Sequence, residues 1–215
     1  MCVLFEYSNE PLPAIMHGLG ITKYDSVLSV CCSGDQALAM AALGARVTAA
    51  DINPAQVEYA IAGQAEIIKG DFSRYTEMNP RIKLIDRILG ISDSKLCDLE
   101  LIKQRNKFFR THLETLISGA SNVKFITADI YGQDPAQYNK IYLYNADLPA
   151  SGGISLIGSA VPGTLFYVSD EFMYCQIKKR CPMQTKIDDE LTDKARDYPG
   201  SPYILFRPII FIRTE

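Results

Sequence analysis

Residues 27–51, VLSVCCSGDQALAMAALGARVTAAD, contain the clearest structural pattern of this chain. The apolar run Val27–Cys32 is typical of a strand that is buried on both faces of a parallel sheet. Ser33–Asp35 interrupts that run, and Gln36–Leu43 is rich in strong helix formers until a glycine stops it. Arg46–Ala50 predicts a second buried strand. A strand, a helix and a strand within about 30 residues predict a right-handed βαβ unit.

The chain that follows this unit continues the alternation of helices and strands. Asn53 suits a helix N-cap and Pro54 the first helical position, so a helix is predicted from Pro54 to about Lys69. Residues 71–119 carry apolar side chains at helical spacings, and we expect two or three helices there that form a cap or an insertion before the third strand. Beyond it, strands are predicted at 123–128, 140–144 and 163–169, and helices near 135–138 and 152–160.

The carboxyl-terminal part of the chain has a weaker pattern. Residues 171–200 are charged and polar, and their pattern favours neither helix nor strand. Tyr203–Ile212 has strand character but contains Pro208, which cannot donate a hydrogen bond to a neighbouring strand, so we expect terminal strand material near a sheet edge.

Together these elements predict an α/β protein with an open, mostly parallel twisted sheet and helices on both faces. The 215 residues favour one domain, 1–215, over two. Hydrophobic residues make up 47% and charged residues 22% of the chain, as in ordinary globular proteins.

The net charge indicates which classes of partner can be expected, and the cysteines indicate the cellular compartment. The net charge is −3 and the longest basic run is Lys178–Arg180, so a nucleic-acid partner is not expected. The six cysteines include the adjacent pair Cys31 and Cys32 inside an apolar run, and no pair has C-x-x-C spacing. We therefore expect no metal and a reducing, cytoplasmic location. No signal peptide or transmembrane stretch is recognisable.

Acidic residues follow nearly every predicted strand. Because the carboxyl ends of parallel strands meet at one edge of the sheet, where ligands bind in open α/β folds, these residues predict a polar rim at the binding edge. They are Asp35, Asp51, Asp129, Asp147 and Asp170.

The first turn and the second strand end favour an adenosine ligand without phosphates. Gly34 allows a close backbone approach, and the helix start offers N–H groups to a carboxylate. Asp51 follows Gly34 by 17 residues, where an acidic side chain accepts both ribose hydroxyls. Asp129 is placed for the adenine amine or for a neighbouring backbone contact, and Asp35 for the ammonium of an amino acid end. The turn lacks the two or three glycines that cradle a pyrophosphate, so S-adenosylmethionine is favoured over NAD or FAD.

VLSVCCSGDQALAMAALGARVTAADINPAQ, residues 27–56, resembles the cofactor segment of a family of class I methyltransferase-fold proteins. That family includes the S-adenosylmethionine:diacylglycerol 3-amino-3-carboxypropyltransferases, and NVKFITADI at 122–130 and IYLYNADLP at 141–149 resemble its later segments more loosely. The resemblance implies a Rossmann-like class I methyltransferase fold with S-adenosylmethionine as co-substrate. The residues expected to contact the cofactor are Ser33, Gly34, Asp35, Gln36, Asp51, Ile52, Asp129, Ile130 and Asn145.

These observations predict an S-adenosylmethionine-dependent transferase that moves either a methyl or a 3-amino-3-carboxypropyl group. Both reactions depend mainly on alignment of the reacting atoms, so a dedicated base is optional. Asp147 and Tyr144 are the candidates for a catalytic role. The acceptor, whether small molecule, lipid or protein, and the oligomeric state are not predicted. The alternatives are a non-catalytic S-adenosylmethionine-binding module or sensor and, less favoured, a nucleotide-dependent oxidoreductase.

Overall fold

The computed structural model describes residues 2–8, 10–77, 93–143, 152–169, 171–180, 184–197 and 207–215, and for 93–99 the backbone alone. Tyr144, Asn145, Asp147 and Asp170 lie outside the described residues, so the predictions made for them stay predictions.

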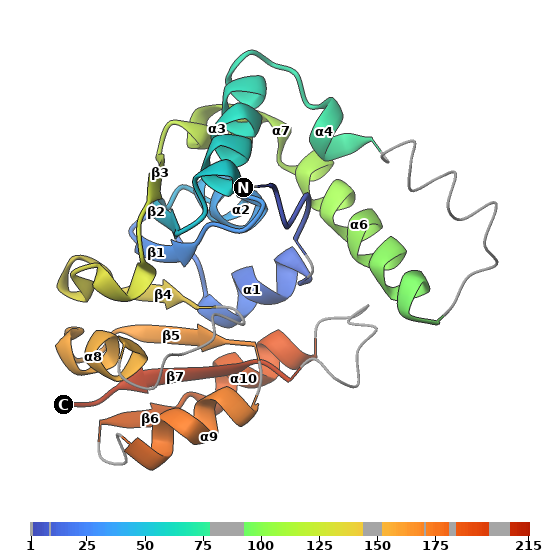
Figure 1. Cartoon of the computed structure of the whole chain (residues 1–215). Helices are drawn as coiled ribbons and strands as arrows, with labels where there is room; N and C mark the ends of the chain where they lie inside the picture. Colours follow the sequence, from blue (N-terminus) through green and yellow to red (C-terminus); the bar gives the residue numbers. More distant parts are fainter. Residues whose placement is uncertain are drawn as a thin grey trace.

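The described part of the chain forms a seven-stranded sheet in the order β3-β2-β1-β4-β5-β7-β6 (Figure 1). Neighbouring strands are parallel from β3 through to β5, and β7 is antiparallel to both β5 and β6. The strands are β1 (Ser26–Val30), β2 (Arg46–Asp51), β3 (Val123–Thr127), β4 (Lys140–Tyr142), β5 (Leu165–Val168), β6 (Thr185–Ile187) and β7 (Ile209–Arg213). This order confirms the predicted Rossmann-like α/β class, with a mostly parallel sheet and an antiparallel end of the class I methyltransferase type.

Two layers of helices cover the sheet, and a hydrophobic cluster lies under each layer. One layer contains α1 (Leu12–Leu19), α2 (Asp35–Ala42), α3 (Pro54–Ile68), α7 (Leu113–Ala120) and α10 (Asp189–Arg196). The other contains α8 (Gly152–Ser159), α9 (Glu171–Arg180) and the short 3₁₀ helix η1 (Ile130–Gly132). The remaining helices are α4 (Ser73–Thr76), α6 (Asp93–Thr111) and the 3₁₀ helix η2 (Pro135–Gln137).

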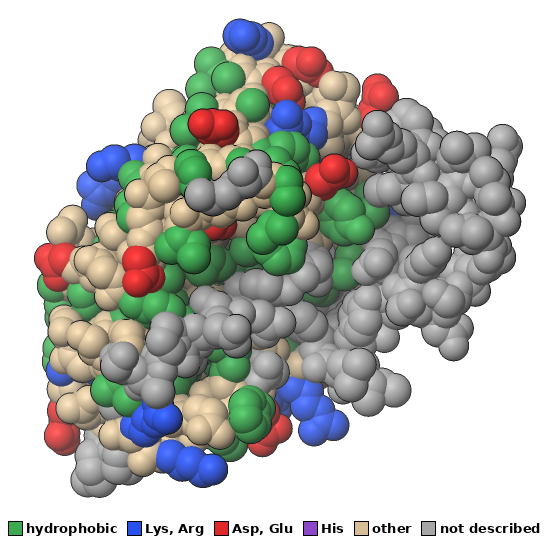
Figure 2. All heavy atoms as spheres, viewed as in Figure 1, with side chains coloured by type: hydrophobic (Ala, Val, Ile, Leu, Met, Phe, Trp, Pro, Cys, Tyr) green, Lys and Arg blue, Asp and Glu red, His purple; other side chains and the backbone are tan. Residues whose placement is uncertain are grey.

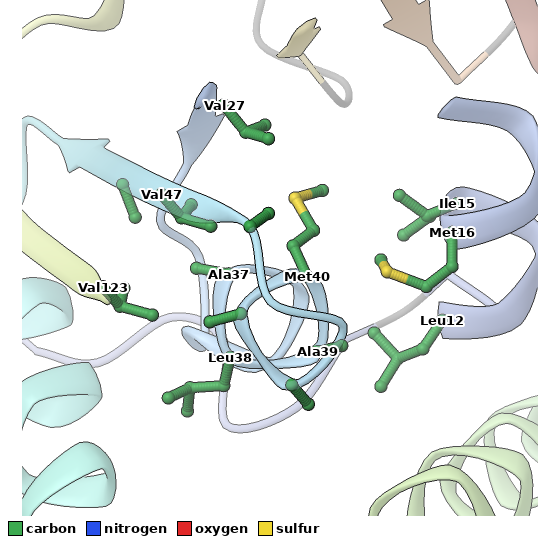
Figure 3. Close-up of a cluster of buried hydrophobic side chains, with 14 of the residues drawn as sticks. Leu12, Ile15, Met16, Val27, Ala37, Leu38, Ala39, Met40, Val47 and Val123 are labelled. Atoms are coloured by element: carbon green, nitrogen blue, oxygen red, sulfur yellow. The ribbon is translucent and has the colours of Figure 1, made fainter. Parts of the chain in front are cut away.

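Helix α2 is buried on every side, which explains its alanine-rich sequence. All eight of its residues are buried, and Figure 3 shows Leu38 and Met40 of this helix among side chains of α1 and of the first three strands. Helices α2 and α7 are very close together at this point, since a Cβ added to Gly119 of α7 would come within 2.2 Å of the Ala41 carbonyl oxygen of α2. Small side chains are therefore required where α2 and α7 cross.

The βαβ unit and the helix after Asn53 are confirmed. β1, α2 and β2 follow one another as predicted, and Val27 pairs with Val47 in parallel register. Asn53 caps α3, because its side chain accepts a hydrogen bond from the Ala55 N–H. α4, α6 and α7 supply the helices predicted for 71–119, in the part of that stretch that the structure describes.

The carboxyl-terminal third contains one strand that was not predicted. β7 is the last strand but one and lies near the sheet edge, as expected, and it pairs with β5 on one side and with the unpredicted edge strand β6 on the other. Pro208 precedes the strand, so its missing N–H interrupts no ladder there. Residues 171–200, which had no clear pattern, contain α9, β6 and α10. The amino-terminal helix α1 was not predicted either, because its short apolar sequence lacks a polar face.

The chain turns in opposite directions after β1 and after β4, which lie side by side in the sheet. β1 leads into α2 in one layer and β4 precedes α8 in the other. This is the topological switch point, and ligands of open α/β sheets bind beyond the strand ends there. Among the described helices, none combines the length and apolarity needed to cross a membrane.

Candidate functional site at the carboxyl edge of the sheet

The turn after β1 is tight because two of its residues have left-handed backbone. Cys32 has a φ of 44° and Gly34 a φ of 86°, and the Gly34 N–H donates to the Cys31 carbonyl at 2.7 Å. A Cβ on Gly34 would lie 2.8 Å from the Ala60 Cβ of α3. Glycine is therefore required here by the backbone angle and by the close approach of α3.

Ser33, Asp35 and Gln36 of the same turn are buried. The Ser33 hydroxyl accepts a long hydrogen bond, 3.4 Å, from the Asp35 N–H. The thiols of Cys31 and Cys32 are free and buried in the core, and burial raises the pKa of both. Neither sulfur is a nucleophile at neutral pH in this environment.

Asp51 and Ile52 lie at the end of β2. The Asp51 side chain is half-buried, burial raises the pKa of its carboxyl, and its Oδ1 accepts a hydrogen bond from the Asn53 N–H at 2.9 Å. The Ile52 side chain is 74% exposed. A hydrogen-bond acceptor and a bare aliphatic surface therefore stand next to each other at the edge of the sheet.

Asp129 and Ile130 follow β3 at the same edge. Asp129 is exposed and its Oδ1 accepts a hydrogen bond from the Tyr131 N–H at 3.0 Å, so it caps η1. Ile130 is buried and belongs to the cluster under α8 and α9. β2 and β3 are adjacent and parallel, so Asp51 and Asp129 come from neighbouring strand ends, at the edge where the sequence predicted a polar rim.

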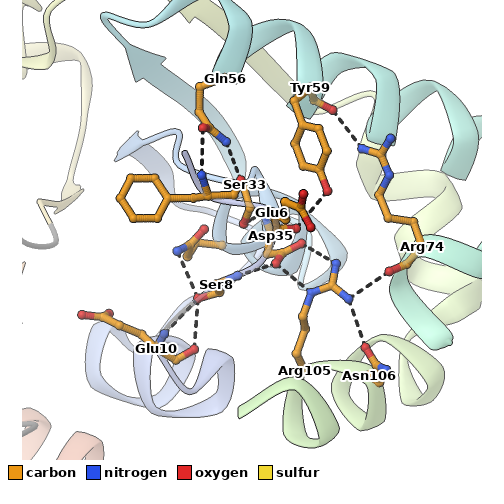
Figure 4. Close-up of polar contacts among 12 residues, drawn as sticks. Glu6, Ser8, Glu10, Ser33, Asp35, Gln56, Tyr59, Arg74, Arg105 and Asn106 are labelled. Carbon is orange, nitrogen blue, oxygen red and sulfur yellow. Dashed lines mark hydrogen bonds and ion pairs between the residues drawn. The ribbon is translucent and has the colours of Figure 1, made fainter. Parts of the chain in front are cut away.

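Asp35 is engaged by a residue that the sequence analysis missed. Both of its carboxylate oxygens accept hydrogen bonds from the Arg105 guanidinium of α6, at 2.7 and 2.8 Å, and one of them also accepts from the Ser8 N–H at 2.7 Å (Figure 4). Burial alone would lower the pKa of Arg105, but the Asp35 carboxylate outweighs it and keeps that pKa above its ordinary value. The turn that was expected to hold the cofactor is thus tied to α6 by a buried ion pair.

One sequence signal could have revealed Arg105. Ile102, Arg105 and Phe109 follow one another at spacings of three and four, and all three are buried on the same side of α6. An arginine in the middle of an apolar stripe indicates a buried carboxylate partner, since an unpaired charge is rarely buried.

The amino-terminal segment, residues 2–8, runs across this edge. Its backbone is held by side chains of α3 and its cap: Asn53 donates to the Cys2 carbonyl, Gln56 hydrogen-bonds with the backbone of Leu4 and Phe5, and Tyr59 donates to the Glu6 carbonyl. The segment therefore lies along the amino-terminal half of α3, next to the end of β2. Figure 2 shows the molecule from the same side as Figure 1, with hydrophobic side chains in the upper centre and charged side chains mostly around them.

The structure brings eight of the nine predicted cofactor contacts to the first three strand ends. These are Ser33, Gly34, Asp35, Gln36, Asp51, Ile52, Asp129 and Ile130. The ninth, Asn145, lies with the catalytic candidates Tyr144 and Asp147 outside the described residues. That any of them contacts a ligand stays a prediction.

Of the comparisons with known proteins, only the one with solved structures found similar proteins. No protein-family model matches the chain, and no curated protein matches it. An RNA methyltransferase from Salinibacter ruber in complex with S-adenosyl-L-homocysteine aligns with 95% of this chain and 90% of its own, at 14% identity and a TM-score of 0.48. A predicted O-methyltransferase from Agrobacterium tumefaciens aligns with 96% of this chain and 81% of its own, at 11% identity and a TM-score of 0.48. The [4+2]-cyclase SpnF aligns with 94% and 80%, at 12% identity and a TM-score of 0.49. Identities this low say nothing about the reaction, and the fold assignment depends on the strand order of the sheet.

Proposed function

We propose that the chain is a transferase that binds S-adenosylmethionine at the carboxyl edge of the sheet and passes one of its alkyl groups to an acceptor. The observation that carries this proposal is the pairing of the Cys32–Gly34 turn with Asp51 and Ile52 at the neighbouring strand end. The turn provides close backbone approach, Asp51 provides an acceptor for the ribose hydroxyls, and Ile52 provides an apolar surface for the adenine ring.

The transferred group is a methyl or a 3-amino-3-carboxypropyl group, and the resemblance of residues 27–56 favours the second. In both cases a nucleophile of the acceptor attacks a carbon bonded to the sulfonium, and the carbon–sulfur bond breaks as the new bond forms. The by-product identifies the group: S-adenosylhomocysteine remains after methyl transfer, and methylthioadenosine after aminocarboxypropyl transfer. Asp147 and Tyr144, which follow β4 in the sequence, stay the candidates for a catalytic role, and Asn145 stays a candidate contact of the cofactor.

Calorimetric titration with S-adenosylmethionine, S-adenosylhomocysteine, methylthioadenosine and NAD tests the ligand. We expect the sulfonium compound and its by-products to bind, and NAD not to bind. Binding without either by-product after incubation with candidate acceptors would favour the non-catalytic binding module. NAD binding in place of S-adenosylmethionine would overturn the proposal.

Replacing Asp51 tests the ribose contact. Asp51→Ala should weaken S-adenosylmethionine binding by about 1–3 kcal/mol, because the ribose hydroxyls lose a buried acceptor. Asp134→Ala is the matched control: Asp134 also accepts a backbone N–H two residues along, from Ala136, but precedes η2 and the amino end of β4. Equal affinities of the two folded variants, measured by calorimetry, would contradict the ribose assignment.

A further inference from the structure

Glu10 is a buried carboxyl group at the switch point of the sheet. It lies two residues before α1 and is 1% exposed. Its Oε2 accepts a hydrogen bond of 2.6 Å from the hydroxyl of Tyr142, the last residue of β4. The Tyr142 ring is 5.3 Å from that of Tyr167 in β5, with which Tyr142 pairs in the sheet. The Glu10 carboxyl therefore lies next to the carboxyl ends of β4 and β5, on the β4 side of the switch point.

Three buried oxygens around Glu10 have no hydrogen-bond partner among the described residues. They are Glu10 Oε1, Gln36 Oε1 and Tyr167 Oη. Ser8 links the first two residues, since its hydroxyl accepts from Gln36 Nε2 at 3.1 Å and donates to the Glu10 carbonyl at 3.0 Å (Figure 4). A buried polar atom left without a partner is destabilising and needs an explanation, and a bound ligand is one.

These three oxygens indicate the chemistry of the missing partner. The amide oxygen of Gln36 can only accept a hydrogen bond, and so can an ionised Glu10 carboxylate. No cation of the described structure serves them, because the nearby Arg105 guanidinium bonds Asp35, Asn106 and the Arg74 carbonyl. A group with several N–H donors and a positive charge would serve all three oxygens and would also favour the carboxylate form of Glu10. An ammonium group, with three donors, has both, whereas a sulfonium has the charge but no donor.

We propose that Glu10, Gln36 and Tyr167 bind the α-ammonium group at the amino acid end of S-adenosylmethionine, with Glu10 as its counter-ion. This inference rests on the proposed function, and it assigns to Glu10 the contact that the sequence suggested for Asp35. Asp35 already has a cation, Arg105, on both of its oxygens. The Glu10 carboxyl is not accessible to solvent in the folded chain. Ser8 and Glu10 must therefore shift locally as the ligand binds.

Binding of the ammonium should release a proton from Glu10. In the structure without ligand, burial raises the pKa of Glu10 to about 8, although the Tyr142 hydroxyl opposes the effect, so the carboxyl is mostly protonated at pH 7. The described groups that face it are Tyr142, Tyr167 and Cys32, and burial raises the pKa of each, so all stay neutral. A positive charge beside Glu10 favours its carboxylate, and the proton leaves to the buffer.

The test is calorimetric titration near pH 7 in buffers of different ionisation enthalpy, which counts protons released per ligand bound. For the unmodified protein we expect most of one proton for S-adenosylmethionine and for S-adenosylhomocysteine, which both carry the ammonium, and none for methylthioadenosine, which lacks it. Glu10→Gln should abolish the release and weaken the first two ligands roughly ten- to hundredfold, with methylthioadenosine unaffected. Glu6→Gln, an exposed glutamate of the same segment, is the control and should behave like the unmodified protein.

The outcomes separate this inference from the proposed function. S-adenosylmethionine binding without proton release would overturn the role of Glu10 and leave the proposed function intact. Release with S-adenosylmethionine but not with S-adenosylhomocysteine would overturn the ammonium assignment, because the sulfonium would then be the partner. Equal weakening of all three ligands by Glu10→Gln would show a purely structural role. Failure of every ligand to bind would remove the proposed function itself. If Glu10→Gln does not fold, the proton counts of the unmodified protein still decide.

Discussion

At the scale of single residues, the main interaction of the candidate site is the ion pair between Asp35 and Arg105. Their side chains are 1% and 5% exposed, and the guanidinium also lies 5.0 Å from the centre of the Tyr75 ring. A buried pair gains little over an apolar pair of the same shape, but removing one partner leaves a charge without compensation. The position of the turn that is proposed to bind the cofactor therefore depends on α6.

The two kinds of change at this pair should differ in stability. Arg105→Met should lower the free energy of unfolding by about 3–5 kcal/mol, because Asp35 stays buried without its cation. The double variant Asp35→Asn with Arg105→Met should lose clearly less, since no charge is left in the core. Urea denaturation measures both. A double variant as unstable as the single one would mean that packing by the arginine stem, and not charge pairing, is what matters.

At the scale of helices, the position of the turn depends on close packing of α2 between the sheet and α7. The crossing of α2 and α7 is a contact of backbone with backbone, at Ala41 and Gly119. Helices approach this closely only where a residue has no side chain, so Gly119 sets the separation of the two helices. The turn that is proposed to bind the cofactor lies at the amino end of α2, so the position of α2 determines the position of that turn.

Replacing Gly119 tests this contact against a matched helical glycine. Gly119→Ala should lower the free energy of unfolding by about 1–3 kcal/mol, because the new methyl group would overlap backbone atoms of α2. Gly158 of α8 has nothing within 4 Å of an added Cβ, and Gly158→Ala should leave stability unchanged or raise it by about 0.4–1 kcal/mol. Thermal or urea denaturation compares them, and similar effects of the two substitutions would refute close packing as the cause.

At the scale of the whole molecule, the buried Glu10 links folding to pH. Its pKa is near 4.5 when the chain is unfolded and about 8 in the folded protein. Between these values the folded state binds more protons than the unfolded state, so this group makes the protein less stable as the pH rises. The carboxyl that is proposed to bind the ammonium is therefore also a source of instability without ligand, as is common for functional groups.

The pH dependence of stability checks this linkage. From about pH 5 to pH 8 the free energy of unfolding of the unmodified protein should fall relative to that of Glu10→Gln, with a slope of at most about 1.4 kcal/mol per pH unit. The difference between the two proteins is the quantity to measure by urea denaturation, because their other ionisable groups are shared. A constant difference across this range would contradict a protonated Glu10 in the folded state.

The β1–α2–β2 unit, and the position at strand ends of the residues proposed to bind the cofactor, could be predicted from local sequence. Apolar runs, helix formers, Gly34 and the Asn53 cap all act within a few residues of their own position, so their effects are readable without the rest of the chain. β6 and α10 could not be recognised for the opposite reason. Their stability comes from packing on β7 and α1 and not from a local pattern.

Which groups meet at the candidate site depends on contacts between residues that are far apart in the sequence. Arg105 reaches Asp35 across 70 residues, and Tyr142 reaches Glu10 across 132. These contacts give Asp35 a cation as its partner. They leave Glu10 buried with one oxygen that has no hydrogen-bond partner among the described residues. The charge and pKa of an ionisable group depend on its neighbours in space and on its distance from water, and neither is encoded in the few residues around it.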